Sequence, residues 1–130
     1  MNLELFEKIK QDIMEEPRRL YMDGFIRTWS KWEIKIDKNA PPCGTAACIA
    51  GKACLLSGKI HLDNMLAISS YAIDLLDISY LRRLEGGRVP LFYLEYWPEK
   101  LRNKHEKAKS PRGRAKAACD AIDAFIRDEF

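Results

Sequence analysis

The chain has 130 residues, a mass of 15.0 kDa and a net charge of +3, with 47% apolar and 32% charged residues. This length supports one hydrophobic core without disulfides or metals, so we expect a single domain over residues 1–130. No window approaches the ~20 uncharged apolar residues that a transmembrane helix needs, which excludes a membrane-spanning protein.

The first residues indicate the compartment. Residues 1–8 (MNLELFEK) carry acidic side chains where a secretory signal peptide has basic ones, and the long apolar core of such a peptide does not follow. We therefore expect a cytoplasmic protein. In that reducing compartment the four cysteines are expected to be thiols or metal ligands rather than disulfides.

Two N-terminal segments differ in their hydrophobic period. Residues 3–16 repeat apolar side chains every three or four positions and stop at Pro17, which predicts an amphipathic helix. Residues 25–36 instead alternate apolar and polar side chains around Ser30 and Lys31, which predicts a small β-hairpin. We expect this hairpin as a minor addition to a helical fold.

Capping residues and prolines predict five more helices. Ser, Thr or Asp caps begin three of them, and a proline stands in the first turn of the last two. The short helix after Ser79 has Leu81 and Leu84 as its apolar positions. These helices are expected over residues 45–57, 63–76, 79–85, from 98 onward, and 111–128. The sequence therefore predicts a mainly α-helical bundle of about five to six helices.

Three of the four cysteines lie in the stretch PPCGTAACIAGKAC, residues 41–54. A metal site would use Cys43, Cys48 and His61, because Cys48 and Cys54 point about 120° apart on one helix. A nucleophile would be Cys48, whose pKa a helix N-terminus can lower. Packing explains more residues, because small side chains recur at four-residue spacing and cysteine is commonly buried. We prefer packing.

Two sets of side chains are candidate binding surfaces. Aromatic residues are favoured at interfaces, with core packing as the alternative; the candidates are Trp29, Trp32, Tyr93, Tyr96 and Trp97. Residues 100–116 hold eight cations against the single acid Glu106, which suits a nucleic-acid backbone or a solvated helix face. These cations are Lys100, Arg102, Lys104, Lys107, Lys109, Arg112, Arg114 and Lys116. Gly44, Thr45 and Ala46, at the expected helix start, form a secondary anion candidate.

The stretch CGTAACIAG resembles the hallmark of a family of short, uncharacterised bacterial and phage proteins. Similar positions recur downstream, at a Leu-Leu pair, a Leu-Phe pair, a Trp-Pro pair and the last helix. The matches are Cys43, Gly44, Thr45, Cys48, Ile49, Ala50, Gly51, Leu75, Leu76, Ser79, Leu91, Phe92, Trp97, Pro98, Ala118, Ile122, Phe125 and Ile126. Lys52 departs from the pattern, which has a bulky aromatic or His there. The resemblance implies a small α-rich cytoplasmic or phage-encoded domain without an assigned activity.

The expected function follows from the cysteine stretch and the two candidate binding surfaces. No catalytic constellation accompanies the cysteines, so we expect a non-enzymatic protein without a cofactor that binds a protein partner in the cytoplasm. If the chain is phage-encoded, the compartment is the host cytoplasm and a host factor is the natural partner. The alternatives are a nucleic-acid-binding module that uses residues 100–116 and a metal or thiol protein built on the cysteines.

Overall fold

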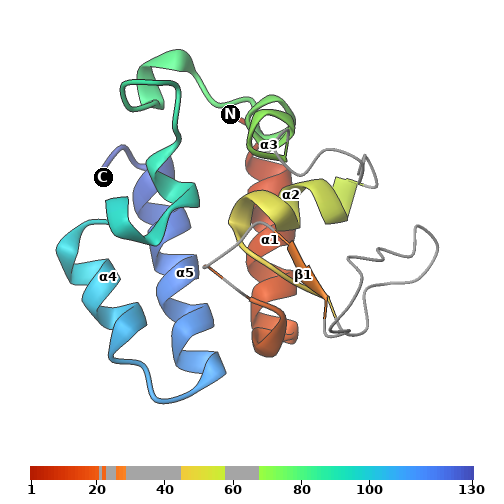
Figure 1. Cartoon of the computed structure of the whole chain (residues 1–130), viewed down its shortest axis with the longest axis vertical. Helices are drawn as coiled ribbons and strands as arrows, with labels where there is room; N and C mark the ends of the chain where they lie inside the picture. Colours follow the sequence, from red (N-terminus) through yellow and green to blue (C-terminus); the bar gives the residue numbers. More distant parts are fainter. Residues whose placement is uncertain (21, 23–25, 29–44, 58–67) are drawn as a thin grey trace.

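The computed structural model describes residues 1–20, 22, 26–28, 45–57 and 68–130, and within them the chain is mainly helical (Figure 1). The α-helices are α1 (Leu3–Glu15), α2 (Ile49–Ser57), α3 (Ile68–Leu76), α4 (Glu99–Glu106) and α5 (Pro111–Ile126). Short 3₁₀ turns are η1 (Pro17–Arg19), η3 (Tyr80–Arg82), η4 (Pro90–Phe92) and η5 (Leu94–Tyr96). Two strands, β1 (Ile26–Thr28) and β2 (Thr45–Ala47), complete the described elements. The mainly helical fold class predicted from the sequence is confirmed.

Local signals place the first and last helices correctly. The Asn2 side chain accepts a hydrogen bond from the Leu5 amide (3.1 Å) and so caps α1, which ends two residues before Pro17. The Ser110 hydroxyl accepts from the Gly113 amide (3.1 Å) at the start of α5. Each cap satisfies an amide that has no partner within its helix.

The start of α2 differs from the prediction. The helix begins at Ile49 rather than at Thr45, because Thr45–Ala47 forms β2. This strand pairs antiparallel with β1, with Ile26 opposite Ala47 and Thr28 opposite Thr45. The backbone groups of Thr45–Ala47 thus pair with a segment far away in the sequence, and local capping signals carry no information about such a partner.

The remaining predicted boundaries agree in part. Strand β1 falls within the first half of the predicted hairpin, whereas its second half lies outside the described residues. The helix expected over residues 63–76 is described from Ile68 onward. The short helix expected over residues 79–85 is only the single turn η3.

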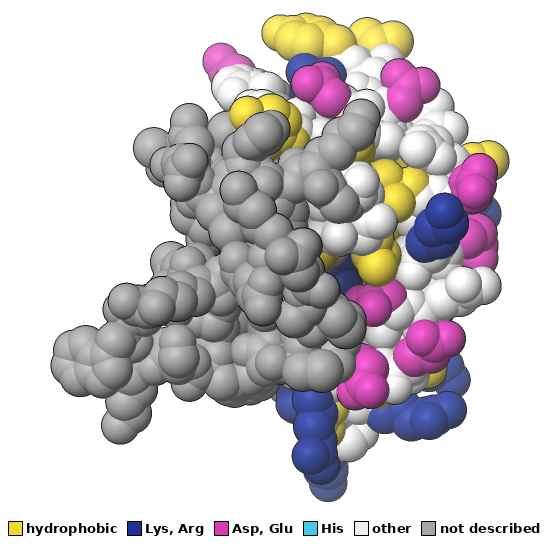
Figure 2. All heavy atoms as spheres, turned by 90° about the vertical axis from the view of Figure 1, so that its right-hand side faces the viewer, with side chains coloured by type: hydrophobic (Ala, Val, Ile, Leu, Met, Phe, Trp, Pro, Cys, Tyr) yellow, Lys and Arg dark blue, Asp and Glu magenta, His cyan; other side chains and the backbone are white. Residues whose placement is uncertain are grey.

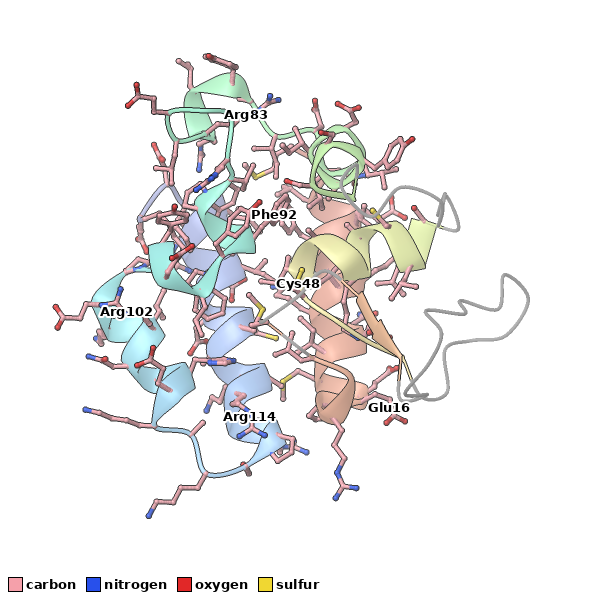
Figure 3. The ribbon with its side chains drawn as sticks, in the orientation of Figure 1. Glu16, Cys48, Arg83, Phe92, Arg102 and Arg114 are labelled. Atoms are coloured by element: carbon pink, nitrogen blue, oxygen red, sulfur yellow. The ribbon has the colours of Figure 1, made fainter. Side chains whose placement is uncertain are left out.

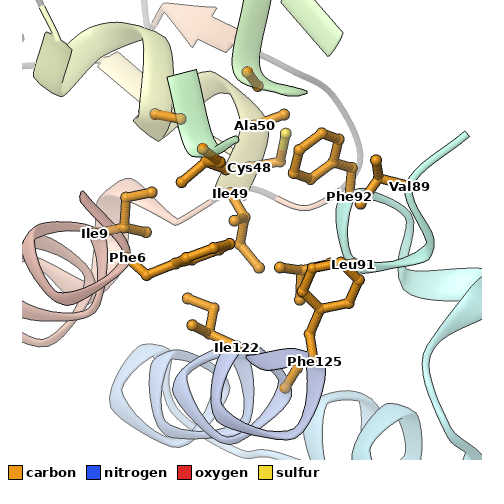
Figure 4. Close-up of a cluster of buried hydrophobic side chains, with 14 of the residues drawn as sticks. Phe6, Ile9, Cys48, Ile49, Ala50, Val89, Leu91, Phe92, Ile122 and Phe125 are labelled. Carbon is orange, nitrogen blue, oxygen red and sulfur yellow. The ribbon is translucent and has the colours of Figure 1, made fainter. Parts of the chain in front are cut away.

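The hydrophobic core lies between α1, α5, α2 and the segment that carries η4 (Figure 4). The rings of Phe6 on α1 and Phe125 on α5 are 6.4 Å apart, and Ile49 at the start of α2 lies between these helices and Leu91. Small residues on α5, including Ala118, let the neighbouring helices approach closely. The expected apolar face of the last helix is therefore the wall of the core.

Among the described residues, none of the helices combines the length and the apolar character needed to cross a bilayer.

Candidate functional site

The thiol of Cys48 lies at the junction of β2 and α2, in the interior of the molecule (Figures 3 and 4). The residue is 1% exposed, and burial raises the pKa of its thiol to about 11, although the amides of Gly51 and Ala50 and the charge of Lys52 act in the opposite direction. The sequence argument for a lowered pKa is therefore wrong. Desolvation disfavours the thiolate more than the helix start favours it.

The other cysteines in the described residues give the same result. Burial raises the pKa of the Cys54 and Cys119 thiols to about 11 as well. A thiol with such a pKa is almost entirely protonated at neutral pH, and the thiolate is the nucleophilic and metal-binding form. The packing interpretation therefore best explains Cys48 and Cys54, the two thiols of the stretch that the structure describes.

The predicted metal and anion sites have no support in the described part of the chain. Cys43, His61 and Gly44 lie outside it, and no group of three or more His, Cys, Asp or Glu residues within it could hold a metal ion. Thr45 and Ala46 belong to β2, so they are not the N-terminus of a helix. The anion candidate is therefore wrong for those two residues, because its argument required a helix there.

The residues of the predicted aromatic surface differ in how deeply they are buried. Trp97 is 2% exposed, its indole N–H donates to the Leu91 carbonyl (2.9 Å), and its ring meets His105 edge-on at 5.6 Å. Trp97 is thus a core residue, and its prediction as a partner contact is wrong. Tyr93 and Tyr96 are half-buried with ring centroids 5.9 Å apart, while Trp29 and Trp32 lie outside the described residues.

The eight predicted cations lie on α4, on α5 and on the turn between them, and two of those on α4 are engaged within the protein. On α4, Lys104 forms an ion pair with Asp120 of α5, and Arg102 donates to the Glu95 carbonyl (3.2 Å). Five cations gather around the turn and the first half of α5, a group we call the basic end. These residues are Lys107, Lys109, Arg112, Arg114 and Lys116. Arg102 and Arg114 mark the two regions in Figure 3.

A buried ion pair is one feature that the sequence analysis missed. Lys52 on α2 is 3% exposed, and its Nζ lies 2.6 Å from Oδ2 of Asp12 on α1. Buried lysines are rare unless paired. The signal in the sequence was a lysine within a helix of small and apolar residues, where a solvated side chain has no room.

An exposed apolar group is the second missed feature. Tyr80 and Leu81 on η3 are 77% and 92% exposed, and Leu84 just beyond it is also exposed. We call these three residues the apolar projection. Figure 2 shows hydrophobic side chains protruding at the top of the molecule, the end at which Figure 1 places η3. Three exposed apolar side chains within five residues of the chain are a candidate contact surface.

The backbone beneath the apolar projection is tied down on both sides. The Ser79 hydroxyl accepts from the Leu81 amide (3.3 Å), and the Leu84 amide donates to the Arg88 carbonyl (2.7 Å). Gly86 and Gly87 close that turn with positive φ angles of 84° and 81°, which other residues rarely adopt. The exposed side chains are therefore presented by an ordered turn.

Two arginines fix the same segment to the body of the protein. Arg82 donates to the Phe125 carbonyl (2.5 Å) at the end of α5 and pairs with Asp128 at 3.4 Å. Arg83 donates to the Ile78 carbonyl (2.9 Å), and its guanidinium lies 5.6 Å from the centre of the Tyr80 ring. This contact limits the orientations open to Tyr80 before any partner arrives.

In comparisons with known proteins, no family model, curated protein or solved structure matches this chain.

Proposed function

We propose that this chain is a small binding protein that acts by docking a protein partner on the apolar projection. The observation that carries the proposal is the 92% exposure of Leu81 beside the 77% exposure of Tyr80, on a turn held by hydrogen bonds at both ends. A preordered turn loses little conformational entropy on binding, so apolar burial at these two side chains would convert efficiently into affinity.

The chemistry of the projection suits a protein more than a small ligand. Tyr and Arg are among the residue types that most often dominate the energy of protein interfaces, and the exposed Tyr80 and Arg88 occur within nine residues of each other. Figure 2 shows hydrophobic side chains that stand out from the surface at this end, so they would enter a hollow on the partner. Small molecules, in contrast, are usually bound within concave sites.

The setting of this activity is part of the same proposal. We place the protein in the cytoplasm, of the host if the chain is phage-encoded, as the CGTAACIAG stretch suggests. Binding rather than catalysis is favoured because the described thiols have raised pKa values.

Site-directed photo-crosslinking in cells tests the proposal. A photoreactive amino acid at position 81 should capture one defined protein, and adding Tyr80→Ser should abolish that product while leaving the fold intact. Gln11 on α1 is a matched control position, because it is exposed and distant in sequence from the projection. The same products from positions 81 and 11, or none from position 81, would contradict the proposal.

A further inference from the structure

The end of the molecule opposite the apolar projection has a different chemistry. Figure 1 shows η3 at one end of the long axis and the turn between α4 and α5 at the other. The ten residues 107–116 contain five cations and no acid. Four of these cations are exposed, namely Lys107, Lys109, Arg112 and Lys116, and Arg114 is half-buried.

The cations of the basic end do not form ion pairs within the described part of the chain. Elsewhere in the described chain Lys104 pairs with Asp120, Lys10 with Asp123 and Lys52 with Asp12. Within the same described residues, none of the five cations of the basic end makes an ion pair or a side-chain hydrogen bond. Their charge therefore remains available to an external anion.

Nearby acids reduce this charge without cancelling it. Glu106 precedes the turn, and Glu15 and Glu16 lie at the end of α1, which Figure 1 places at the same end of the molecule. Arg18 on η1, a turn that packs against α5, is exposed and offsets one of them. Cations still outnumber acids at this end, whereas the chain outside residues 100–116 has more acidic than basic side chains.

The turn that carries these cations is closely packed. The Ser110 hydroxyl accepts a hydrogen bond from the Gly113 amide, and the Ala108 amide donates one to the His105 carbonyl (3.3 Å). A Cβ placed on Gly113 would lie 3.1 Å from the Cβ of Ala108, so the turn and the first part of α5 are in direct contact. The cations are thus spread over an ordered corner rather than a loose tail.

The surroundings distinguish between the anionic partners that could bind here. All the exposed large apolar residues of the described chain lie outside residues 99–126. Insertion into a membrane surface needs bulky apolar side chains, and protein interfaces usually have an apolar or aromatic centre. A nucleic-acid backbone needs neither, because phosphate contacts and counterion release supply the affinity.

We infer that the basic end binds the phosphate backbone of duplex nucleic acid, with little sequence preference. Duplex is favoured over single strands because it presents about one charge per 1.7 Å of axis, and because single-strand binding relies on aromatic stacking platforms. This interaction is independent of the proposed protein docking, since the two surfaces lie at opposite ends of the molecule. The chain could then tether a protein partner to nucleic acid.

Fluorescence anisotropy with a labelled 20-base-pair DNA duplex of mixed sequence tests this inference. Binding should be measurable at about 50 mM KCl and should weaken with added salt, with a slope of log K against log salt of about −4 for four to five phosphates. The variant Lys107→Gln/Lys109→Gln/Arg112→Gln should bind at least about tenfold more weakly, with a slope reduced by about 3.

Matched controls separate local from general charge effects. Lys8→Gln/Arg88→Gln/Arg127→Gln removes the same net charge from exposed positions elsewhere and should bind nearly as well as the native chain. Tyr80→Ser/Leu81→Ser should also retain DNA binding, so failure of the docking proposal would be seen separately. The inference is overturned by an absence of binding at 50 mM KCl, by an equal loss in the control, or by equal affinity for single-stranded DNA or phosphatidylserine vesicles.

Discussion

Lys52 of α2 and Asp12 of α1 form an ion pair in which the lysine is buried and the carboxylate reaches the surface. The Nζ to Oδ2 distance is 2.6 Å, and the side chains are 3% and 26% exposed. The pair joins α2 to α1 near the point where β2 ends and α2 begins. The two side chains need the ion pair to different extents. Lys52 is almost completely shielded from water, whereas Asp12 is partly exposed to it.

Removing the carboxylate should therefore cost more than removing the ammonium. Asp12→Asn leaves the buried Lys52 without its counter-charge and should lower the free energy of unfolding by about 2–4 kcal/mol. Lys52→Met keeps the volume and leaves Asp12 partly hydrated, so about 1 kcal/mol is expected. Urea denaturation of both variants and of the double variant measures the difference. A larger loss for Lys52→Met than for Asp12→Asn would contradict this description.

The buried thiol of Cys48 predicts a specific dependence of stability on pH. Its pKa rises from 9.0 to about 11 on folding, so below pH 9 the thiol is protonated in both states and its stabilising effect is complete. Between pH 9 and 11 the unfolded chain releases the proton first, and the stabilisation is lost. The stability advantage of the native chain over Cys48→Ala should therefore shrink from pH 8 to pH 11. Urea denaturation at several pH values measures it, and a constant difference would count against a raised pKa.

Trp97 should behave as a core residue. Trp97→Phe removes the buried hydrogen bond to the Leu91 carbonyl and leaves that acceptor without its partner, at a cost of about 1–3 kcal/mol. Tyr96→Phe is the control, since Tyr96 is half-buried and its hydroxyl only accepts a bond from the exposed Arg88. Thermal unfolding of both variants gives the comparison. Equal melting temperatures would show that the indole is not anchored as described.

The cap of α5 should contribute measurably to stability. Ser110→Ala removes the acceptor for the Gly113 amide and should cost about 1 kcal/mol. Ser110→Asp keeps an acceptor and should recover most of that loss. Ser70→Ala, at an exposed position on α3, is the control and should be nearly neutral. The comparison can be made by urea denaturation, and a loss that Asp does not restore would exclude capping as its cause.

The parts of the fold that follow local rules could be read from the sequence. The 3.6-residue periodicity and Pro17 set α1, and Ser110 with Pro111 set the start of α5. The start of α2 could not be found in this way, because Thr45 has the chemistry of a cap but pairs with Thr28 across a long sequence separation. Non-local strand pairing leaves no trace in a window of ten residues.

The candidate surfaces show the same division. The basic end lies in one continuous segment, and therefore the sequence could locate its cations, although not the pairing of Lys104 with Asp120. Leu81 has the residue type and spacing of a core position and is nevertheless exposed. Trp97 has the residue type of an interface contact and is nevertheless buried. Burial depends on what the rest of the chain covers, which composition alone does not encode.

The docking surface is tested most directly by the dissociation constant of the protein captured through position 81, measured with purified components. Tyr80→Ser/Leu81→Ser should weaken that complex at least about thirtyfold, the effect expected when interface hot spots are removed. Lys107→Gln/Lys109→Gln/Arg112→Gln at the opposite end should leave its affinity unchanged. Unchanged affinity in the Tyr80→Ser/Leu81→Ser variant, with its fold intact, would contradict the assignment of the apolar projection as the docking surface.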